Sequence, residues 1–247
     1  MRDDLGHAVP LAGAASRVVS LVPSLTEAIA ASAPDVLVGA TDWCTHPADL
    51  SVTRVRGTKN PDLAAIRALT PDLVVANQEE NRELDVRRLR DSGVAVWVTR
   101  IETVEESIDS MSRLFSLALG LPEPPWLVSA RSLWSEPAAP RLRVAVPIWR
   151  DPWMVVGSPT YTDDLLARAG LVNVMAPGDG RYPTVTPDAI DDAGADVVLL
   201  PDEPYVFTDS DGPEALRTPT RLVSGRLLTW YGPAMVEAHE MLATVQP

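Results

Sequence analysis

The chain has 247 residues, of which 46% are hydrophobic and 22% charged, and its formal net charge is −13. This length favours two lobes over one compact core. An acidic surface repels phosphate backbones and anionic lipid, so nucleic acid and membrane surfaces are excluded as expected partners. The charge is spread along the chain, which indicates a role in solubility rather than attraction of a cationic ligand. The longest apolar stretches have the length of strands, so no membrane insertion is predicted.

The first 21 residues have no positively charged start and no unbroken apolar stretch, so they do not resemble a signal peptide. The sequence as given therefore predicts a cytoplasmic protein. The alternative is an extracytoplasmic protein whose leader was removed. The single cysteine, Cys44, excludes an intrachain disulfide.

Short β-rich runs alternate with amphipathic stretches, which is typical of βαβ units and a mainly parallel sheet. In the first half, strands are predicted at residues 17–22, 36–39, 72–76 and 94–98. Four helices are predicted. One covers residues 25–32, one starts at residue 61, one follows residue 80 and ends near residue 91, and one runs from residue 103 to about residue 120. A long polar surface loop is expected at residues 40–61.

Four helix starts are predicted from capping patterns in this half, one of them at Thr103 with Glu106 three residues later. Ser24 and Glu27 have the spacing of a capping box, and Asn77 with Glu80 repeats it. Asn60 followed by Pro61 places a capping residue before a proline at the first helical position.

Prolines at 122, 124, 125, 137 and 140 bracket one short helical stretch at about residues 126–134, which is predicted to link the lobes. The α/β pattern then restarts. Strands are predicted at residues 142–147, 196–200 and 222–223, and helices at 163–169 and 233–245. The predicted fold is α/β: two α/β lobes with mainly parallel sheets, residues 1–120 and 141–247, joined by a linking helix within residues 121–140, with a ligand cleft between the lobes.

In open α/β sheets, ligands bind beyond the carboxyl ends of the strands. The segments that follow the predicted strands are rich in aromatic residues, which suit a large flat ligand. The alternative is that some of these rings fill the interface between the lobes. The predicted ligand-binding residues are Trp43, Thr58, Lys59, Trp149, Tyr182, Trp230 and Tyr231.

Asp42, Cys44 and His46 alternate within one loop, and all three side-chain types bind metals. Cys44 and His46 are therefore candidate metal ligands; the alternative is a small buried cysteine beside turn-forming residues. Glu79, Glu80 and Arg82 form a charged cluster. At a helix start, these residues indicate a cap that complements the helix dipole rather than a functional site. No nucleophile and base pattern is present, so no catalytic residue is predicted and the protein is expected not to be an enzyme.

Several segments resemble class III periplasmic binding proteins, which bind vitamin B12, siderophores or haem. The resemblance covers nearly the whole chain. It is carried by RVVSLVPSLTEAIAA, VGATDWCTHP, GTKNPDLAAIRALTPDLVVA, VGSPTYTDDLLARAG, RYPTVTPDAI and ADVVLLP.

The resemblance implies two lobes joined by one rigid helix, with the ligand held in the cleft and only small hinge motion. It places Trp43, Thr58, Trp149, Tyr182 and Trp230 at cleft positions. The family's two docking glutamates for an ABC permease fall on Ala64 and Asp188, which makes a permease partner doubtful.

The sequence thus predicts a binding protein for a corrinoid or another metal chelate, with no cofactor required. One alternative is the substrate-binding component of an ABC importer whose leader is missing. The other is a metallochaperone or enzyme that acts on the same ligand through Asp42, Cys44 and His46.

Overall fold

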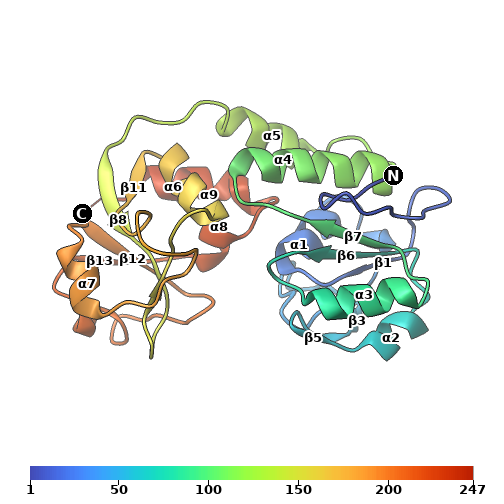
Figure 1. The fold of residues 1–247 in the computed structure, drawn as a ribbon. Coiled ribbons are helices and arrows are strands. Elements are labelled where there is room, and N and C mark those ends of the chain that lie inside the picture. The colour runs from blue at the N-terminus through green and yellow to red at the C-terminus, as the bar shows by residue number, and fades with distance from the viewer. Residues whose placement is uncertain (247) are drawn as a thin grey trace. The chain divides into compact units, whose positions relative to one another are not determined.

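The structure of the protein is a computed structural model that describes residues 1–246. It forms two compact units, each described here by itself (Figure 1). The first unit contains Met1–Ile101, Glu105–Ser129 and Tyr231–Pro233. The second unit contains Glu102–Val104, Ala130–Trp230 and residues 234–246. The predicted linker, residues 121–140, is thus divided between the two units at residue 129, and its role as a separate link stays a prediction.

The first unit is built on a five-stranded parallel sheet with the order β3-β2-β1-β6-β7. Its strands are β1 (Val18–Ser20), β2 (Leu37–Ala40), β3 (Thr53–Arg54), β6 (Leu73–Asn77) and β7 (Val96–Thr99). The three central strands, β2, β1 and β6, are buried at every position but one, as expected for a parallel sheet whose faces are both covered. In Figure 1, α2 (Leu63–Ala68) and α3 (Glu83–Asp91) lie below this sheet, and α4 (Val104–Arg113) lies above it.

The other elements of the first half are short. They are α1 (Pro23–Ala30), the 3₁₀ turn Pro34–Val36, the hairpin of β4 (Arg56–Gly57) and β5 (Asn60–Pro61), the π-helical turn Leu114–Ala118 and α5 (Pro125–Leu133). Trp126 of α5 packs edge-on against Phe115 and donates its indole N–H to Ser32 at 2.9 Å. These contacts attach the start of α5 to the first unit.

The second unit is built on a four-stranded parallel sheet with the order β11-β8-β12-β13. Its strands are β8 (Leu142–Ala145), β11 (Leu171–Asn173), β12 (Val197–Pro201) and β13 (Thr220–Val223). An antiparallel hairpin, β9 (Pro147–Trp149) with β10 (Met154–Val155), follows β8 directly. The remaining elements are α6 (Tyr161–Arg168), α7 (Pro187–Asp192), the 3₁₀ turn Pro213–Ala215, α8 (Gly225–Thr229) and α9 (Ala234–Ala243).

Each sheet has one point at which the direction of strand addition reverses. In the first unit the chain adds β2 on one side of β1 and later adds β6 on the other side. In the second unit it adds β11 on one side of β8 and later adds β12 on the other. At such a switch point the two following connections diverge to opposite faces, which opens a crevice at the carboxyl ends.

The predicted fold class is confirmed, and each predicted strand is present within a few residues of its expected position. The predicted caps are wrong at three helices. Helix α1 begins at Pro23 after Val22, so Ser24 lies inside the helix, and α2 is capped by Asp62, whose carboxylate accepts from Ala64 N and Ala65 N. Helix α3 begins only at Glu83, because Asn77 closes a separate turn.

The surface loop predicted at residues 40–61 contains structure that the sequence reading missed. Thr53–Arg54 adds edge strand β3 to the sheet, and β4 with β5 forms a small hairpin. Among the described residues, no helix is long and apolar enough to cross a membrane.

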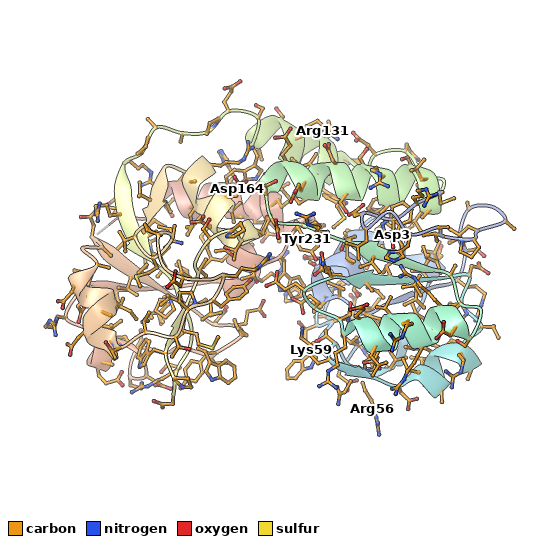
Figure 2. The ribbon with its side chains drawn as sticks, in the orientation of Figure 1. Asp3, Arg56, Lys59, Arg131, Asp164 and Tyr231 are labelled. Atoms are coloured by element: carbon orange, nitrogen blue, oxygen red, sulfur yellow. The ribbon has the colours of Figure 1, made fainter. Side chains whose placement is uncertain are left out.

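The N-terminal segment packs into the first unit through two acidic residues. The Asp3 carboxylate (Figure 2) is fully buried, accepts from Arg90 at 2.7 Å and receives the backbone N–H groups of Leu5 and His7. Asp4 accepts from Arg113 at 2.5 Å and from Ser110. Residues near the start of the chain are therefore structural parts of this unit.

We expect Asp3→Ala to lower the free energy of unfolding by about 3 kcal/mol, because it leaves the Arg90 guanidinium without its buried partner. Urea unfolding followed by circular dichroism measures this change. Asp49→Ala, which removes an exposed carboxylate of the same unit, is the matched control and should change stability by less than about 0.5 kcal/mol. Equal effects of the two substitutions would contradict this role for Asp3.

Candidate functional site

The switch point of the first unit is occupied by a tight turn, residues 77–81, here called the Asn77 turn. The Asn77 side-chain oxygen accepts from Glu79 N at 2.8 Å and from Glu80 N at 3.2 Å. The Asn81 side-chain oxygen accepts from Asn77 N at 2.9 Å. These bonds hold the backbone at the end of β6 in one conformation.

The Asn77 turn is also tied to two neighbouring loops. The Asn81 amide donates to Leu21 O at the end of β1 and, at 3.0 Å, to Thr58 O in the β4–β5 hairpin. The Lys59 ammonium donates to Glu79 O. Thr58 and Lys59, two predicted ligand-binding residues, are therefore joined to the switch point through hydrogen bonds.

Trp43 lies beside the same hairpin. Its side chain is 66% exposed, although a Cβ added to Gly57 would lie only 3.3 Å from the indole Nε1. The small residue thus lets the ring approach the hairpin backbone while one face stays open to solvent. A large ring held in this way can provide a flat apolar surface for a ligand.

Tyr231 is the second aromatic residue of this region, and Figure 2 shows it at the same edge of the first unit as Lys59. Its hydroxyl is buried beside Ser24 and Thr99, and burial together with the nearby Glu80 carboxyl raises its pKa. Burial likewise raises the pKa of Glu80, while the Lys59 ammonium opposes that shift and Glu79 adds to it. Tyr231 is only 7% exposed, so it can present little of its ring to a ligand.

The two candidate metal ligands have different environments. Cys44 is fully buried, and its Sγ lies 3.0 Å from Thr26 Oγ1 and 3.1 Å from Thr41 Oγ1. Burial raises the pKa of the Cys44 thiol. His46 is exposed and lies next to Thr45 Oγ1 at 3.2 Å. In residues 1–246, no group of three or more metal-binding side chains is brought together.

The switch point of the second unit is lined by aromatic residues from two connections. Trp149, 44% exposed, ends β9 and packs edge-on against Tyr205, which follows β12, with ring centroids 5.7 Å apart. Tyr205 also contacts Phe207 at 4.7 Å, and Phe207 stacks on Trp153. The exposed Trp149 ring thus lies at the outer end of a row of packed rings.

Charged groups hold these rings in place. Arg150 forms ion pairs with Asp211 and, at 2.6 Å, with Glu214, and its guanidinium lies over the Trp153 ring. The Tyr205 hydroxyl donates to Asp211 at 2.6 Å. We call Trp149, Arg150, Tyr205, Asp211 and Glu214 the Trp149 cluster.

Each acidic member of the Trp149 cluster is stabilised in its ionised form. The hydrogen bond from Tyr205 lowers the pKa of Asp211, with Arg150 adding to the effect. The hydrogen bond from Arg150 lowers the pKa of Glu214. The bond to Asp211 raises the pKa of Tyr205, so this hydroxyl stays protonated.

The remaining predicted site residues of the second unit lie apart from this cluster in sequence. Tyr182 is 36% exposed and follows Arg181, which forms an ion pair with Glu102 at 2.5 Å. Trp230 ends α8 and is only 7% exposed. Trp43, Trp149 and Tyr182 are therefore the predicted aromatic residues with substantial open surface.

Comparison with known proteins identifies relatives of one kind. The vitamin B12-binding protein of Salmonella typhi is 30% identical over 188 residues, which cover 72% of this chain and 69% of that protein. The vitamin B12-binding protein of Vibrio cholerae is 30% identical over 102 residues, 40% of this chain and 37% of that protein. No family model matches the sequence.

The chain belongs to the class III family of periplasmic binding proteins.

Solved structures of this class III family share the fold over nearly the whole chain. The periplasmic vitamin B12-binding protein of Vibrio cholerae has a TM-score of 0.76 at 20% identity and covers 93% of this chain and 96% of its own. A periplasmic heme-binding protein from Pseudomonas aeruginosa has a TM-score of 0.77 at 21% identity, covering 93% and 91%. The resemblance stated from the sequence motifs is thereby confirmed, as is the two-lobed α/β fold.

The final set of predicted site residues did not include Arg150, Tyr205 or Asp211, although Tyr205 is one of the aromatic residues in the segments that follow the predicted strands. Tyr205 follows a buried strand, and this position was the only signal available for it. The pairing of Arg150 with Asp211 joins residues 61 positions apart, so no local pattern reveals it.

We expect NMR titration of the side-chain carboxyl carbons to give pKa values below the ordinary range for Asp211 and Glu214. In Arg150→Gln both values should rise, because the ion pairs are lost. With depressed folded-state pKa values, both groups add stability above their ordinary pKa values near 4, and this stability is lost as the pH falls through the folded values. Unchanged titration of both groups in Arg150→Gln would contradict the assigned pairs.

Burial and the raised pKa predict that the Cys44 thiol reacts slowly with Ellman's reagent at pH 7 and rapidly only after unfolding in guanidinium. Immediate reaction of the native protein would show an accessible thiolate. In that case the metal hypothesis predicts that Cys44→Ala and His46→Ala each weaken metal or chelate binding by about tenfold.

Proposed function

We propose that this protein binds a corrinoid, or another metal chelate of similar size, through the exposed aromatic residues at the carboxyl ends of its strands. The observation that carries the proposal is the 30% identity, over 72% of the chain, to a protein named for vitamin B12 binding. Proteins of the same fold are named for binding heme, so the chelate class is broader than corrinoids.

The arrangement of each unit supports this proposal. Trp43 and Trp149 expose 66% and 44% of their side chains, although both lie next to ordered parts of the protein. Exposed aromatic rings at the ends of parallel strands gain free energy when a flat apolar ligand displaces water from them. Neighbouring hydrogen bonds and ion pairs fix the loops before binding, which lowers the entropy cost of association.

The binding role is favoured over an enzyme or metallochaperone role for the loop of Asp42, Cys44 and His46. A metal ligand or nucleophile must be a thiolate, whereas Cys44 is buried between two threonine hydroxyls with a raised pKa. His46 is exposed, and Asp42 is exposed on the other side of Cys44 in the sequence. This loop therefore fits a supporting wall better than a reactive centre.

The location we propose is extracytoplasmic, which is the alternative to the cytoplasmic location predicted from the sequence. The solved relatives whose names give a location are periplasmic. An importer permease is then a partner to test. The doubt about it depends on the residues at two positions: Ala64 is exposed on α2, and Asp188 on α7 pairs with Arg217 at 2.5 Å.

Isothermal titration calorimetry with cobalamin, dicyanocobinamide, heme and a ferric siderophore tests the binding proposal. We expect saturable binding of a corrinoid, weakened in Trp43→Ala and Trp149→Ala by about 0.5–1.5 kcal/mol beyond the loss of buried area. Trp126→Phe, which changes a tryptophan packed against Phe115, is the matched control and should bind as the wild type does. Absence of saturable binding by any of these chelates would overturn the proposal.

A further inference from the structure

Lys59 provides a positive charge at the switch point of the first unit that no carboxylate neutralises by direct contact. Its ammonium donates to Glu79 O, a backbone carbonyl of the Asn77 turn, at 2.5 Å. None of the ion pairs among residues 1–246 includes Lys59. A backbone carbonyl orients the ammonium without cancelling its charge, so this side chain is held in place and keeps a full positive charge.

The hairpin that carries Lys59 is ordered by bonds that need no ligand. The Asn81 amide donates to Thr58 O at 3.0 Å and also to a carbonyl at the end of β1. Strands β4 and β5 pair through Gly57 and Asn60 on the two sides of the turn. The ammonium therefore extends from a backbone that is fixed to the ends of β1 and β6, which lowers the entropy lost when it binds a ligand group.

An aromatic surface lies against the same hairpin. The Trp43 side chain is 66% exposed, and its indole Nε1 lies 3.3 Å from the position that a Cβ of Gly57 would take. Lys59 follows Gly57 by two residues and is exposed. Two residues span at most about 7 Å of chain, which is less than the width of a porphyrin or corrin ring. One such ligand can therefore rest on the Trp43 ring and reach the Lys59 ammonium.

The donors of the Lys59 ammonium are only partly used. An ammonium carries N–H donors and no acceptor, and Glu79 O accepts from one of these donors. The donors that remain suit an anionic acceptor, because hydrogen bonds between charged groups are stronger than those between neutral groups. A carboxylate and a phosphate both meet this requirement, whereas an ester or a primary amide offers only a neutral carbonyl. The net charge of −13 repels anions from the protein in general, so a local cation is needed to bind one.

We propose that Lys59 is a specificity-determining residue, which favours chelates that carry a peripheral carboxylate or phosphate over the neutral forms of the same chelates. This inference rests on the proposed function and narrows its ligand class. It differs from a purely structural role, in which Lys59 would only order the Asn77 turn and its loss would affect charged and neutral ligands equally.

Two matched ligand pairs test the proposal. Dicyanocobinamide phosphate and dicyanocobinamide differ by a phosphate, and heme and its dimethyl ester differ by the charge of their carboxyl groups. Affinities at pH 8 are measured by calorimetry for the wild type, Lys59→Gln, Lys59→Arg and the control Arg56→Gln. The control removes an equal charge from an exposed position of the same hairpin.

We expect the preference for the anionic member of a pair to fall roughly fivefold in Lys59→Gln, which is the size of an ion pair at an accessible site. Lys59→Arg should keep most of the preference, because it keeps the charge and the donors. Arg56→Gln should change the preference less than twofold.

A second readout is spectroscopic. Lys59 is the only lysine in the chain, so protein labelled with nitrogen-15 at lysine side chains gives one ammonium signal. On titration, this signal should shift saturably with the anionic member of a pair and less with the neutral member.

The outcomes separate this inference from the proposed function. Saturable binding of both members of each pair, with the same preference in the wild type and Lys59→Gln, would overturn this inference alone. Failure of the wild type to bind any of these chelates would overturn both. A preference in one pair that Lys59→Gln abolishes supports the inference and identifies the anionic group as phosphate or carboxylate. Circular dichroism and thermal midpoints establish that the variants are folded.

Discussion

The structure depends on one constraint: strands that are buried on both faces and run parallel must deliver their following loops to the same edge of the sheet. Both units obey it, with reversals of strand order beside β1 and β8. At each reversal the loops that follow the strands bring together groups that a ligand can use. In the first unit these belong to the Asn77 turn, and in the second to the Trp149 cluster.

At the same edges, the backbone N–H and C=O groups of the strand ends need hydrogen-bond partners, and the loops that follow must be held in one conformation. In the first unit, side-chain amides provide the hydrogen bonds and hold the loops, since the Asn81 amide donates to carbonyl groups of two separate loops. In the second unit, the ion pair of Arg150 with Glu214 and the hydrogen bond from the Tyr205 hydroxyl to Asp211 hold the loops. The row of aromatic rings packs against these groups. Ligand-binding surfaces are thus ordered by interactions that do not require the ligand.

Much of this fold can be predicted from the sequence because runs such as Leu73–Ala76 are apolar, contain β-branched valines and have the length of a strand. Helix starts were less predictable. Ser24 has the spacing of a cap, yet Val22 takes the extended capping conformation and Pro23 occupies the first turn. Asn77 satisfies backbone N–H groups as a cap does, but it closes a turn in front of the helix.

The candidate site likewise contains residues that could be predicted from the sequence and residues that could not. Trp43 and Trp149 could be predicted because each follows a strand and aromatic rings are recognisable in sequence. Their supports could not, since Gly57 beside Trp43 and Asp211 beside Tyr205 become meaningful only after tertiary folding.

The central claim is that exposed rings at these two edges contact the chelate. Fluorine NMR of protein labelled with 5-fluorotryptophan tests it directly, with the seven signals assigned by single Trp→Phe variants. On titration with dicyanocobinamide, the account predicts saturable shifts of the Trp43 and Trp149 signals, while those of the buried Trp97 and Trp134 stay in place. Saturable binding that leaves both the Trp43 and Trp149 signals unchanged would contradict it.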